Sequence, residues 1–264
     1  MKQSSERHPR TFLFGGIAFF SGSLSAVVNH CQWLIEKKRS AYVCVTSLHG
    51  VTEAQHDRAV ERAHACAQLI VPDGTPIVWV GRMKGHPQTE RIYGPDLLHA
   101  LCRMAEGTHT PVFFYGTTER VLERLMRVVQ RAYPTLRMAG RYAPPFRKLT
   151  QSEMRAVIHI IRASQARIVF VGLGTPKQEL WMHEATHHLP GTLLIGVGAA
   201  FDFISGAKPQ APAWIQKVGG EWLYRLFHEP GRLWRRYVSI SFAFPKLIFH
   251  EIVRDIIPKR RANV

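Results

Sequence analysis

The first candidate for chemistry is a single carboxylate inside a turn. Asp73 follows an apolar run that ends at Pro72, and Gly74 comes directly after it. Such a turn holds a side chain at the rim of a cleft, where a carboxylate can serve as a general base. Asp-Gly is also ordinary turn chemistry. Taken alone, this segment favours the turn interpretation over the catalytic one.

A second candidate is a glycine turn that opens a helical pattern. Gly172 and Gly174 precede Lys177 and Gln178, and free N–H groups at the start of that helix can hold an anion. The spacing matches neither the G-x-G-x-x-G fingerprint nor the G-x-x-x-x-G-K-S/T phosphate loop, so we expect no nicotinamide or ATP cofactor. Gln178 suits a hydrogen bond to a sugar or base, and it suits a solvated helix start equally well.

The same helical segment contains a literal H-E-x-x-H match. His183 and His187 would share one helical face with Glu184 beside them, as a zinc hydrolase requires. No acid or histidine follows in a recognised third-ligand pattern, and polar residues suit a helix C-terminus. The sequence therefore predicts no metal site, and a zinc hydrolase remains an alternative.

Two further charged residues have open roles. Arg91 precedes a turn that ends at Asp96, and a guanidinium there suits phosphate binding and ion pairing equally. Asp96 is placed to cap the helix that follows. Asp202 comes after a run of small residues, where capping a turn needs only one carboxylate, so a structural role is favoured over catalysis.

These residues depend on an alternation of apolar strands and amphipathic helices. Continuous apolar strands, each followed by a helix, predict an α/β fold with a Rossmann-like, mainly parallel sheet covered by helices on both faces. Ligands of such sheets gather at the carboxyl ends of the strands, where Thr46, Gly172 and Gly198 fall. We expect strands at 42–46, 77–80, 111–116, 168–172 and 193–198, and helices at 118–131 and 152–164.

Composition narrows the class of partner. Lys and Arg number 35 against 19 Asp and Glu, a formal net charge of +16 that predicts attraction to nucleic acid, an anionic membrane or phosphorylated substrates. Hydrophobic residues make up 46% of the chain, enough for a sizeable core. The 4 cysteines have no C-x-x-C spacing, which fits a reduced, cytoplasmic compartment.

The two ends of the chain differ from its centre. The apolar stretch 12–20 is too short to span a bilayer, and a buried strand and turn are favoured over a signal peptide. We expect an α/β core at 1–221 and a helical appendage at 222–264, where basic and aromatic residues interleave. An apolar face at 238–257 favours membrane contact over a solvated surface, base stacking or pyrophosphate binding alone. The arginines of this appendage are Arg225, Arg232, Arg235 and Arg236.

The order of these segments resembles the WecG/TagA/CpsF family of bacterial glycosyltransferases. The resemblance extends from about Phe14 to Tyr237 and includes Val45-Thr46, Pro72-Asp73-Gly74, Glu90 to Asp96, Phe113 to Gly116, Gly172 to Glu179, Gly196 to Asp202, Gln210 to Trp214, Glu221 to Leu226 and Glu229 to Tyr237. It implies an inverting, metal-independent transfer from a UDP-sugar to a polyprenyl-diphosphate-linked saccharide, without a cofactor, in surface polysaccharide or exopolysaccharide synthesis. The expected location is the cytoplasmic face of the cell membrane.

The resemblance also assigns roles to particular residues. Asp73 matches the proposed base, Arg91 lies in the active site, and Thr46 and Gln178 line the donor pocket together with the glycine turns at Gly172, Gly174 and Gly198. The four appendage arginines complete the site against the diphosphate when the appendage docks on an anionic membrane. Many members have an asparagine two residues after the threonine. Here Leu48 and then His49 follow, so that donor contact is missing or supplied by His49.

Two alternatives from other classes remain. A nucleic-acid-binding protein would explain the charge, but no helix-turn-helix, RRM or zinc pattern accompanies it, and we expect no nucleic-acid partner. A catalytically silent membrane scaffold would explain the appendage but not the ordered polar residues at the strand ends. A homo-oligomer is compatible with the sequence.

Overall fold

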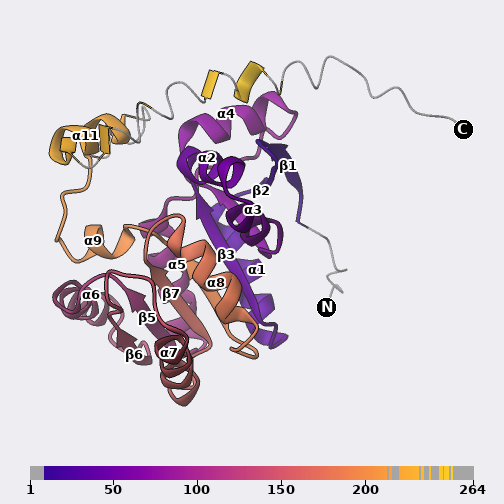
Figure 1. Ribbon diagram of the computed structural model, residues 1–264. Coiled ribbons are helices and arrows are strands. Elements are labelled where there is room, and N and C mark those ends of the chain that lie inside the picture. The colour runs from indigo at the N-terminus through magenta and orange to yellow at the C-terminus, as the bar shows by residue number, and fades with distance from the viewer. Residues whose placement is uncertain are drawn as a thin grey trace, which may run out of the picture.

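The computed structural model describes residues 9–212, 214–215, 220–231, 233–234, 238, 244–245, 247–249 and 251. At its centre lies a six-stranded sheet in which all neighbouring strands are parallel (Figure 1). This confirms the predicted α/β fold. The spatial order is β4 (Leu69–Pro72), β3 (Ala41–Thr46), β8 (Leu193–Gly196), β7 (Ile168–Gly172), β5 (Val112–Gly116) and β6 (Met138–Tyr142).

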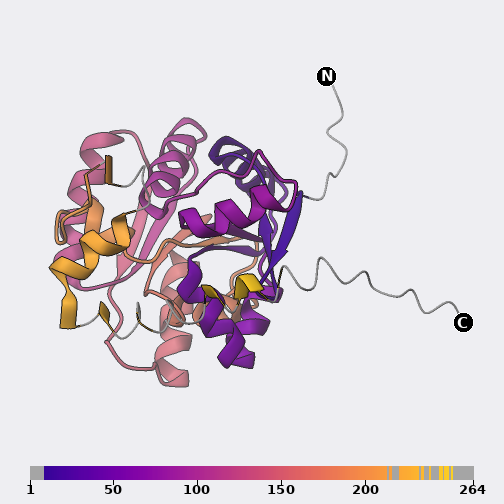
Figure 2. The same cartoon turned by 90° about the horizontal axis from the view of Figure 1, so that it is seen from above.

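Alternation along the strands explains why both faces of the sheet are covered. In β7, Ile168 and Phe170 belong to one apolar cluster and Val169 and Val171 to another, because successive residues of a strand point to opposite faces. Helices therefore lie on both sides of the sheet (Figure 2). The first cluster includes residues of α1 (Leu24–Glu36), α5 (Gly94–Gly107), α6 (Glu119–Ala132) and α9 (Ala200–Ile204); the second includes residues of α2 (Leu48–His56), α3 (Arg58–Ala65), α4 (Thr75–Met83), α7 (Gln151–Ala163) and α8 (Lys177–Thr186).

The apolar stretch near the N-terminus forms a hairpin of β1 (Thr11–Phe14) and β2 (Ile17–Phe20). Gly15 and Gly16 form its two-residue turn with φ of 57° and 85°, the left-handed backbone that such a turn requires. Phe14 and Phe19 are fully buried in the second apolar cluster. This confirms the prediction of a buried strand and turn.

The expectation of a strand at 77–80 is wrong, because this segment lies within helix α4. Pro76 stands in the first turn, where its fixed φ suits a helix start, and Gly74 redirects the chain just before it with a φ of 145°. Ile77 and Val80 are buried whereas Trp79 is 54% exposed. Ile77 and Val80, three residues apart, both pack in the second apolar cluster, which is the spacing of one helical face.

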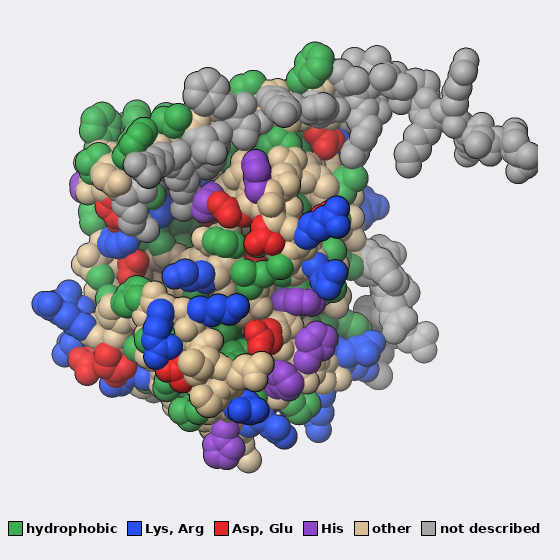
Figure 3. All heavy atoms as spheres, in the orientation of Figure 1, with side chains coloured by type: hydrophobic (Ala, Val, Ile, Leu, Met, Phe, Trp, Pro, Cys, Tyr) green, Lys and Arg blue, Asp and Glu red, His purple; other side chains and the backbone are tan. Residues whose placement is uncertain are grey.

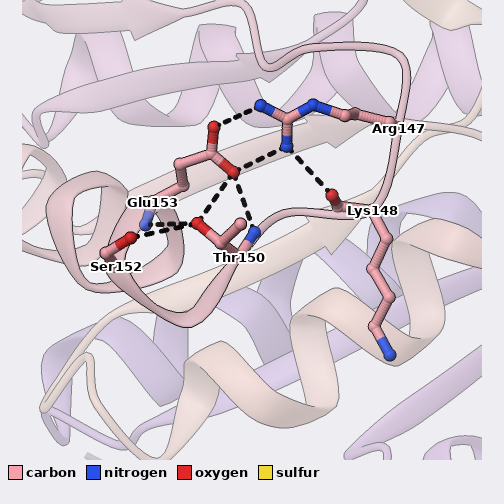
Figure 4. Close-up of polar contacts among 5 residues, drawn as sticks. All are labelled: Arg147, Lys148, Thr150, Ser152 and Glu153. Carbon is pink, nitrogen blue, oxygen red and sulfur yellow. Dashed lines mark hydrogen bonds and ion pairs between the residues drawn. The ribbon is translucent and has the colours of Figure 1, made fainter.

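Helix α7 begins with a complete capping box (Figure 4). The Thr150 hydroxyl accepts the Glu153 N–H at 3.3 Å, and the Glu153 carboxylate accepts the Thr150 N–H at 2.8 Å. Arg147 binds both carboxylate oxygens, at 2.6 and 2.8 Å. The hydrogen bonds from Arg147 and Thr150 lower the pKa of Glu153 to about 2. The predicted helix at 152–164 is confirmed, and its start is fixed by side-chain chemistry.

We expect Thr150→Ala to destabilise the protein by about 1 kcal/mol, because it removes the hydroxyl that accepts the Glu153 N–H. Urea unfolding monitored by circular dichroism measures this difference. Ser152→Ala is the control, since Ser152 contacts Thr150 but accepts no helix N–H among the described hydrogen bonds. Equal stability of Thr150→Ala and the wild type would contradict the capping role.

Described parts of the expected appendage lie on the core. The helix α11 (Glu221–His228) begins one residue before the expected boundary. Further on, Leu247 is buried in the second apolar cluster, and Glu251 accepts the Gly15 N–H at 3.1 Å and pairs with Lys84. Within the described ranges, no helix is both long and apolar enough to cross a membrane.

Candidate active site

The carboxyl ends of β3 and β4 place Asp73 beside Thr46. Pro72 is the register partner of Thr46, and the Asp73 N–H donates to the Thr46 carbonyl oxygen at 2.9 Å. The chain leaves the sheet directly after this bond. The Asp73 side chain is 28% exposed, so its carboxylate reaches solvent at the edge of the sheet where ligands bind in parallel α/β folds.

Arg91 connects Asp73 to the helix α11. One guanidinium nitrogen, Nη2, lies 3.6 Å from the Asp73 carboxylate and 2.6 Å from the Glu221 carboxylate. The Ile92 N–H donates to the Pro72 carbonyl at 2.9 Å, which holds this segment against the end of β4. The sequence predicted that Asp73 and Arg91 belong to one site, and the structure brings them together. It adds Glu221 as a second carboxylate on Arg91.

Electrostatics keep this guanidinium charged. Burial alone would lower the pKa of Arg91, but the charges of Asp73 and Glu221 and the hydrogen bond to Glu221 raise it above the ordinary value. The guanidinium also lies over the Tyr93 ring, 4.6 Å from its centroid. Burial and the two nearby carboxylates raise the pKa of Tyr93. The Tyr93 hydroxyl therefore stays protonated at neutral pH.

The start of α5 joins this site to the neighbouring strand ends. Tyr93 is the N-cap residue of α5, and Asp96 lies in the first turn, so the expectation that Asp96 caps the helix is wrong. A side chain on Gly94 would place its Cβ 2.7 Å from the Val197 carbonyl oxygen. Only glycine permits this approach, which brings Arg91 and Tyr93 close to the end of β8.

Glycines form the ends of the central strands. β5, β7 and β8 end at Gly116, Gly172 and Gly196. A Cβ on Gly116 would lie 2.5 Å from the Gly172 carbonyl oxygen, so these two strand ends touch through backbone alone. In the turns that follow, Gly174 and Gly198 have φ of 75° and 58°, a region that favours glycine. The predicted glycine turns are thus present at neighbouring strand ends.

Gln178 lies inside the protein and joins two of these turns. Its side-chain oxygen accepts the Gly198 N–H at 3.0 Å, and its side-chain nitrogen donates to Glu179 at 2.9 Å. Only 1% of Gln178 is exposed, so the interpretation as a solvated helix start is wrong. A donor contact through its side chain stays a prediction.

Thr46 is also fully buried. Its hydroxyl lies 3.3 Å from Nε2 of His64, a buried residue of α3. The other ring nitrogen, Nδ1, lies 2.9 Å from the Val60 carbonyl oxygen, which can only accept. In neutral His64, Nδ1 therefore carries the proton and Nε2 accepts from Thr46. In this arrangement Thr46 supports the strand end from beneath, and its direct contact with a donor stays a prediction.

His49 stands in the first turn of α2, close to the same strand end. Its Nδ1 lies 3.6 Å from the Glu53 carboxylate one turn further on. The imidazole is thus held at the start of α2, three residues after Thr46. Whether it supplies a donor contact stays a prediction.

The H-E-x-x-H match gains no third ligand from the fold. His183 and His187 lie on α8 and its C-cap with ring centroids 5.7 Å apart, and the Tyr42 hydroxyl lies 3.3 Å from Nδ1 of His183. In the described part of the chain, no group of three His, Cys, Asp or Glu residues is arranged to hold a metal ion. Burial and the charges of His187 and Arg62 lower the pKa of His183. The zinc hydrolase alternative therefore has no structural support.

Asp202 pairs with neighbouring side chains. It lies in α9, accepts a hydrogen bond from the Thr117 hydroxyl at 3.3 Å and pairs with Lys208 at 3.3 Å. Thr117 has a left-handed φ of 48°. These contacts tie α9 to the turn after β5 and fit the structural role favoured from the sequence.

Of the four candidate arginines, Arg225 lies in α11 with its guanidinium 5.4 Å from the centroid of the Phe203 ring. The side chains of Arg232, Arg235 and Arg236 lie outside the described residues. Their predicted contact with a diphosphate therefore stays a prediction.

Exposed apolar side chains gather on α4 and in the appendage. Figure 3 shows green side chains along the upper edge and upper left of the molecule, where Figure 1 places α4 and α11. Such side chains mark interaction surfaces when they are grouped rather than scattered. On α4 these are Trp79 and Met83, and in the described part of the appendage they are Trp222, Leu223, Phe227, Trp234, Val238 and Phe249; Trp214, shortly before the appendage, is exposed as well.

Three buried polar residues of the site were missed by the sequence analysis: His64, Glu179 and Glu221. Glu179 follows Gln178 inside the quoted segment, and Glu221 opens the segment at 221–226, yet neither was assigned a role. Their significance comes from contacts across the fold, such as Glu221 to Arg91, 130 residues apart. In the sequence itself, the order of the segments is the only feature that points to these residues.

The fold and the candidate site define an α/β protein in which a carboxylate and a charged guanidinium lie at the carboxyl edge of a parallel sheet, the edge where ligands of such folds bind. Residues 12–257 match the profile of the Glycosyl transferase WecG/TagA/CpsF family. The chain belongs to this family and is a glycosyltransferase.

Relatives extend the match over most of the chain. One from Bacillus spizizenii strain W23 is 32% identical over 234 residues, 88% of this chain and 89% of the relative. One from Bacillus subtilis strain 168 is 29% identical over 225 residues, 85% of this chain and 86% of the relative. One from Staphylococcus aureus strain MW2 is 31% identical over 169 residues, 64% of this chain and 65% of the relative. All three are named N-acetylglucosaminyldiphosphoundecaprenol N-acetyl-beta-D-mannosaminyltransferase.

Proposed function

We propose that this glycosyltransferase moves an N-acetylmannosaminyl residue from a UDP-activated donor to a polyprenyl-diphosphate-linked saccharide. The names of the relatives support the sugar and the lipid-linked acceptor. The observation that carries the chemistry is the partly exposed Asp73 carboxylate at the strand ends with Arg91 beside it. The product would enter a surface polysaccharide or exopolysaccharide of the bacterium.

In the proposed reaction, Asp73 removes the proton from the acceptor hydroxyl as its oxygen attacks the anomeric carbon. The new glycosidic bond forms while the bond from that carbon to the UDP phosphate breaks, which inverts the configuration. Negative charge grows on the departing phosphate. Arginine side chains and helix N–H groups would stabilise this charge in a metal-independent mechanism, because preorganised positive groups act most strongly where charge develops.

UDP binding tests the nucleotide part of the proposal. We expect UDP and the matching UDP-sugar to raise the thermal midpoint of the protein, because a ligand that binds only the folded state stabilises it. A concentration of 100 times Kd would add about 2.7 kcal/mol to the free energy of unfolding. Differential scanning fluorimetry measures the shift, with ADP as the control nucleotide. The absence of a shift with UDP and with a panel of UDP-sugars would contradict the proposal.

We place the enzyme on the inner face of the cell membrane as a peripheral protein. Residues 1–221 would carry the donor chemistry and 222–264 the membrane contact. The support is the exposed apolar group on α4 and the appendage together with the net charge of +16, since apolar and basic residues together suit an anionic bilayer interface. The same charge fits the phosphate groups of donor and acceptor, whereas the nucleic-acid alternative explains none of the site residues.

We expect Phe227→Ser together with Phe249→Ser to weaken binding to anionic vesicles by about 10-fold or more, because two large apolar side chains would no longer enter the interface. Both are well exposed, at 77% and 66%. Co-sedimentation with vesicles containing phosphatidylglycerol measures the effect. Phe146→Ser is the matched control, since Phe146 is 78% exposed but lies in the loop before α7. Equal loss in the control, or none in the double variant, would overturn this placement.

A further inference from the structure

A carboxyl group is buried directly beneath the glycine turns of the site. Glu179 in the first turn of α8 is fully buried. Its Oε1 accepts hydrogen bonds from the Thr175 hydroxyl and from the Gln178 side-chain nitrogen, both at 2.9 Å. Its Oε2 has no hydrogen-bond partner in the described structure. An acidic side chain with an unsatisfied buried oxygen costs folding free energy.

The groups around Glu179 do not fully offset the cost of burying a charged carboxylate. Burial raises its pKa, and the hydrogen bond from Gln178 and the charge of His64 act in the opposite direction. From β3, Cys44 and Tyr42 also face it, and the charge on Glu179 adds to the rise in the pKa of both. Among these groups only His64 can carry positive charge. Packing therefore does not explain why an acid occupies this place, since an apolar side chain would fill it at lower cost.

Glu179 determines which way the Gln178 amide points. Oε1 of Glu179 receives two donors, so it acts as an acceptor whether the carboxyl is charged or neutral. The Gln178 nitrogen must therefore face Glu179, and its oxygen is left to accept the Gly198 N–H. A reversed amide would place two acceptors together at Glu179 and two donors together at Gly198.

This chain of hydrogen bonds joins two turns at neighbouring strand ends. Thr175 lies in the turn between β7 and α8, and Gly198 lies in the turn between β8 and α9. The Gln178 side chain crosses Gly196, where an added Cβ would lie 3.3 Å from it. The backbone of both turns is thereby held in one relative position through the buried side chains of Gln178 and Glu179.

We propose that Glu179 is a positioning residue for donor binding, which acts through Gln178 to hold the Gly196–Gly198 turn against the Gly172–Thr175 turn. The inference rests on the proposed function and on the family resemblance, which predicts that these turns line the pocket for the UDP-sugar. Glu179 touches no substrate in this arrangement. It fixes the backbone that does.

Substitutions that keep or remove the acceptor test the proposal. Glu179→Leu removes the acceptor and the unsatisfied oxygen together, whereas Glu179→Gln keeps an oxygen for Gln178 and Thr175. Glu184→Leu, on the exposed side of the same helix, is the matched control. For each full-length protein, calorimetry gives the Kd for UDP, steady-state kinetics give KM for donor and acceptor, and thermal unfolding gives stability.

We expect Glu179→Leu to weaken UDP binding and raise the donor KM by about 10-fold or more, a loss of about 1.4 kcal/mol of binding free energy or more. The acceptor KM should stay within about twofold and the thermal midpoint should hold or rise, because loss of the unsatisfied oxygen offsets the lost hydrogen bonds. Glu179→Gln should remain within about threefold of the wild type, since its amide oxygen accepts in the same place. If the role of Glu179 were purely structural, Glu179→Leu would lower the thermal midpoint and would change the donor KM and the acceptor KM together.

Several results would overturn the proposal. Wild-type UDP binding in a folded Glu179→Leu protein would show that the turns need no such support. Equal weakness of the Gln and Leu variants, or failure of the Leu variant to fold, would also overturn it. If the wild type itself binds neither UDP nor any UDP-sugar, the proposed function fails and this inference fails with it. An unaffected variant of a wild type that binds UDP removes only the inference.

Discussion

Asp73→Asn is expected to lower kcat by about 10²-fold or more, the scale of losing a positioned general base. Asparagine has nearly the same shape but cannot take the acceptor proton. The backbone bond from residue 73 to the Thr46 carbonyl is independent of the side chain, so the end of β4 should keep its form. Steady-state and single-turnover kinetics with saturating donor and acceptor measure the loss.

Donor binding separates the loss of the base from a folding defect. The Kd of Asp73→Asn for UDP should stay within about threefold of the wild type, because a base contributes to the transition state rather than to nucleotide binding. Glu184→Gln, an exposed acid on α8, is the control for loss of one negative charge. Turnover close to the wild-type rate in Asp73→Asn would remove Asp73 from the mechanism.

The second large effect is expected for Arg91→Met. This change should lower kcat/KM by about 10²-fold, because it removes a preorganised cation from the site. It also leaves the carboxylates of Asp73 and Glu221 without the charge they share. A carboxylate base must be deprotonated to act, and a nearby cation favours that charged form. The acid limb of the kcat–pH profile should therefore move to higher pH.

A double variant distinguishes the chemical from the structural part of this effect. Arg91→Met alone should lower the thermal midpoint, because Glu221 is only 10% exposed and would lose its partner. Arg91→Met with Glu221→Met should recover the midpoint but not the activity. Recovery of turnover in the double variant would contradict a catalytic role for Arg91. An acid limb at the wild-type pH in the single variant would contradict the coupling to Asp73.

The fold was largely predictable because four central strands are continuous apolar runs. Buried parallel strands leave that mark in the sequence, and β3, β5, β7 and β8 were found from it. The edge strand β6 was missed because its residues are only half-buried and include Gly140 and Arg141. In the segment at 77–80, three β-branched residues resembled a strand. Gly74 and Pro76, just before this segment, start a helix there, and this local signal outweighs the β-branched residues.

The site was predictable only in part. The order of segments identified Asp73 and Arg91 as one site, although Asp73 by itself favoured a plain turn. The partners Glu221, Glu179 and His64 were not identified, because their importance depends on burial and on contacts between distant segments. Burial also added a supporting role for Thr46 and Gln178, whose side chains hold strand ends from within. Their contact with a donor stays a prediction.

The link from α11 to Arg91 ties the position of a helix to the charge of a reaction centre. With α11 in place, the side chains of Asp73, Arg91 and Glu221 together carry one net negative charge; with Glu221 withdrawn, the charges of Asp73 and Arg91 that remain cancel. An entering diphosphate would compete with Glu221 for the same guanidinium. Diphosphate binding would therefore weaken the contact between α11 and Arg91. By reciprocal linkage, withdrawal of α11 would strengthen diphosphate binding by the same free energy.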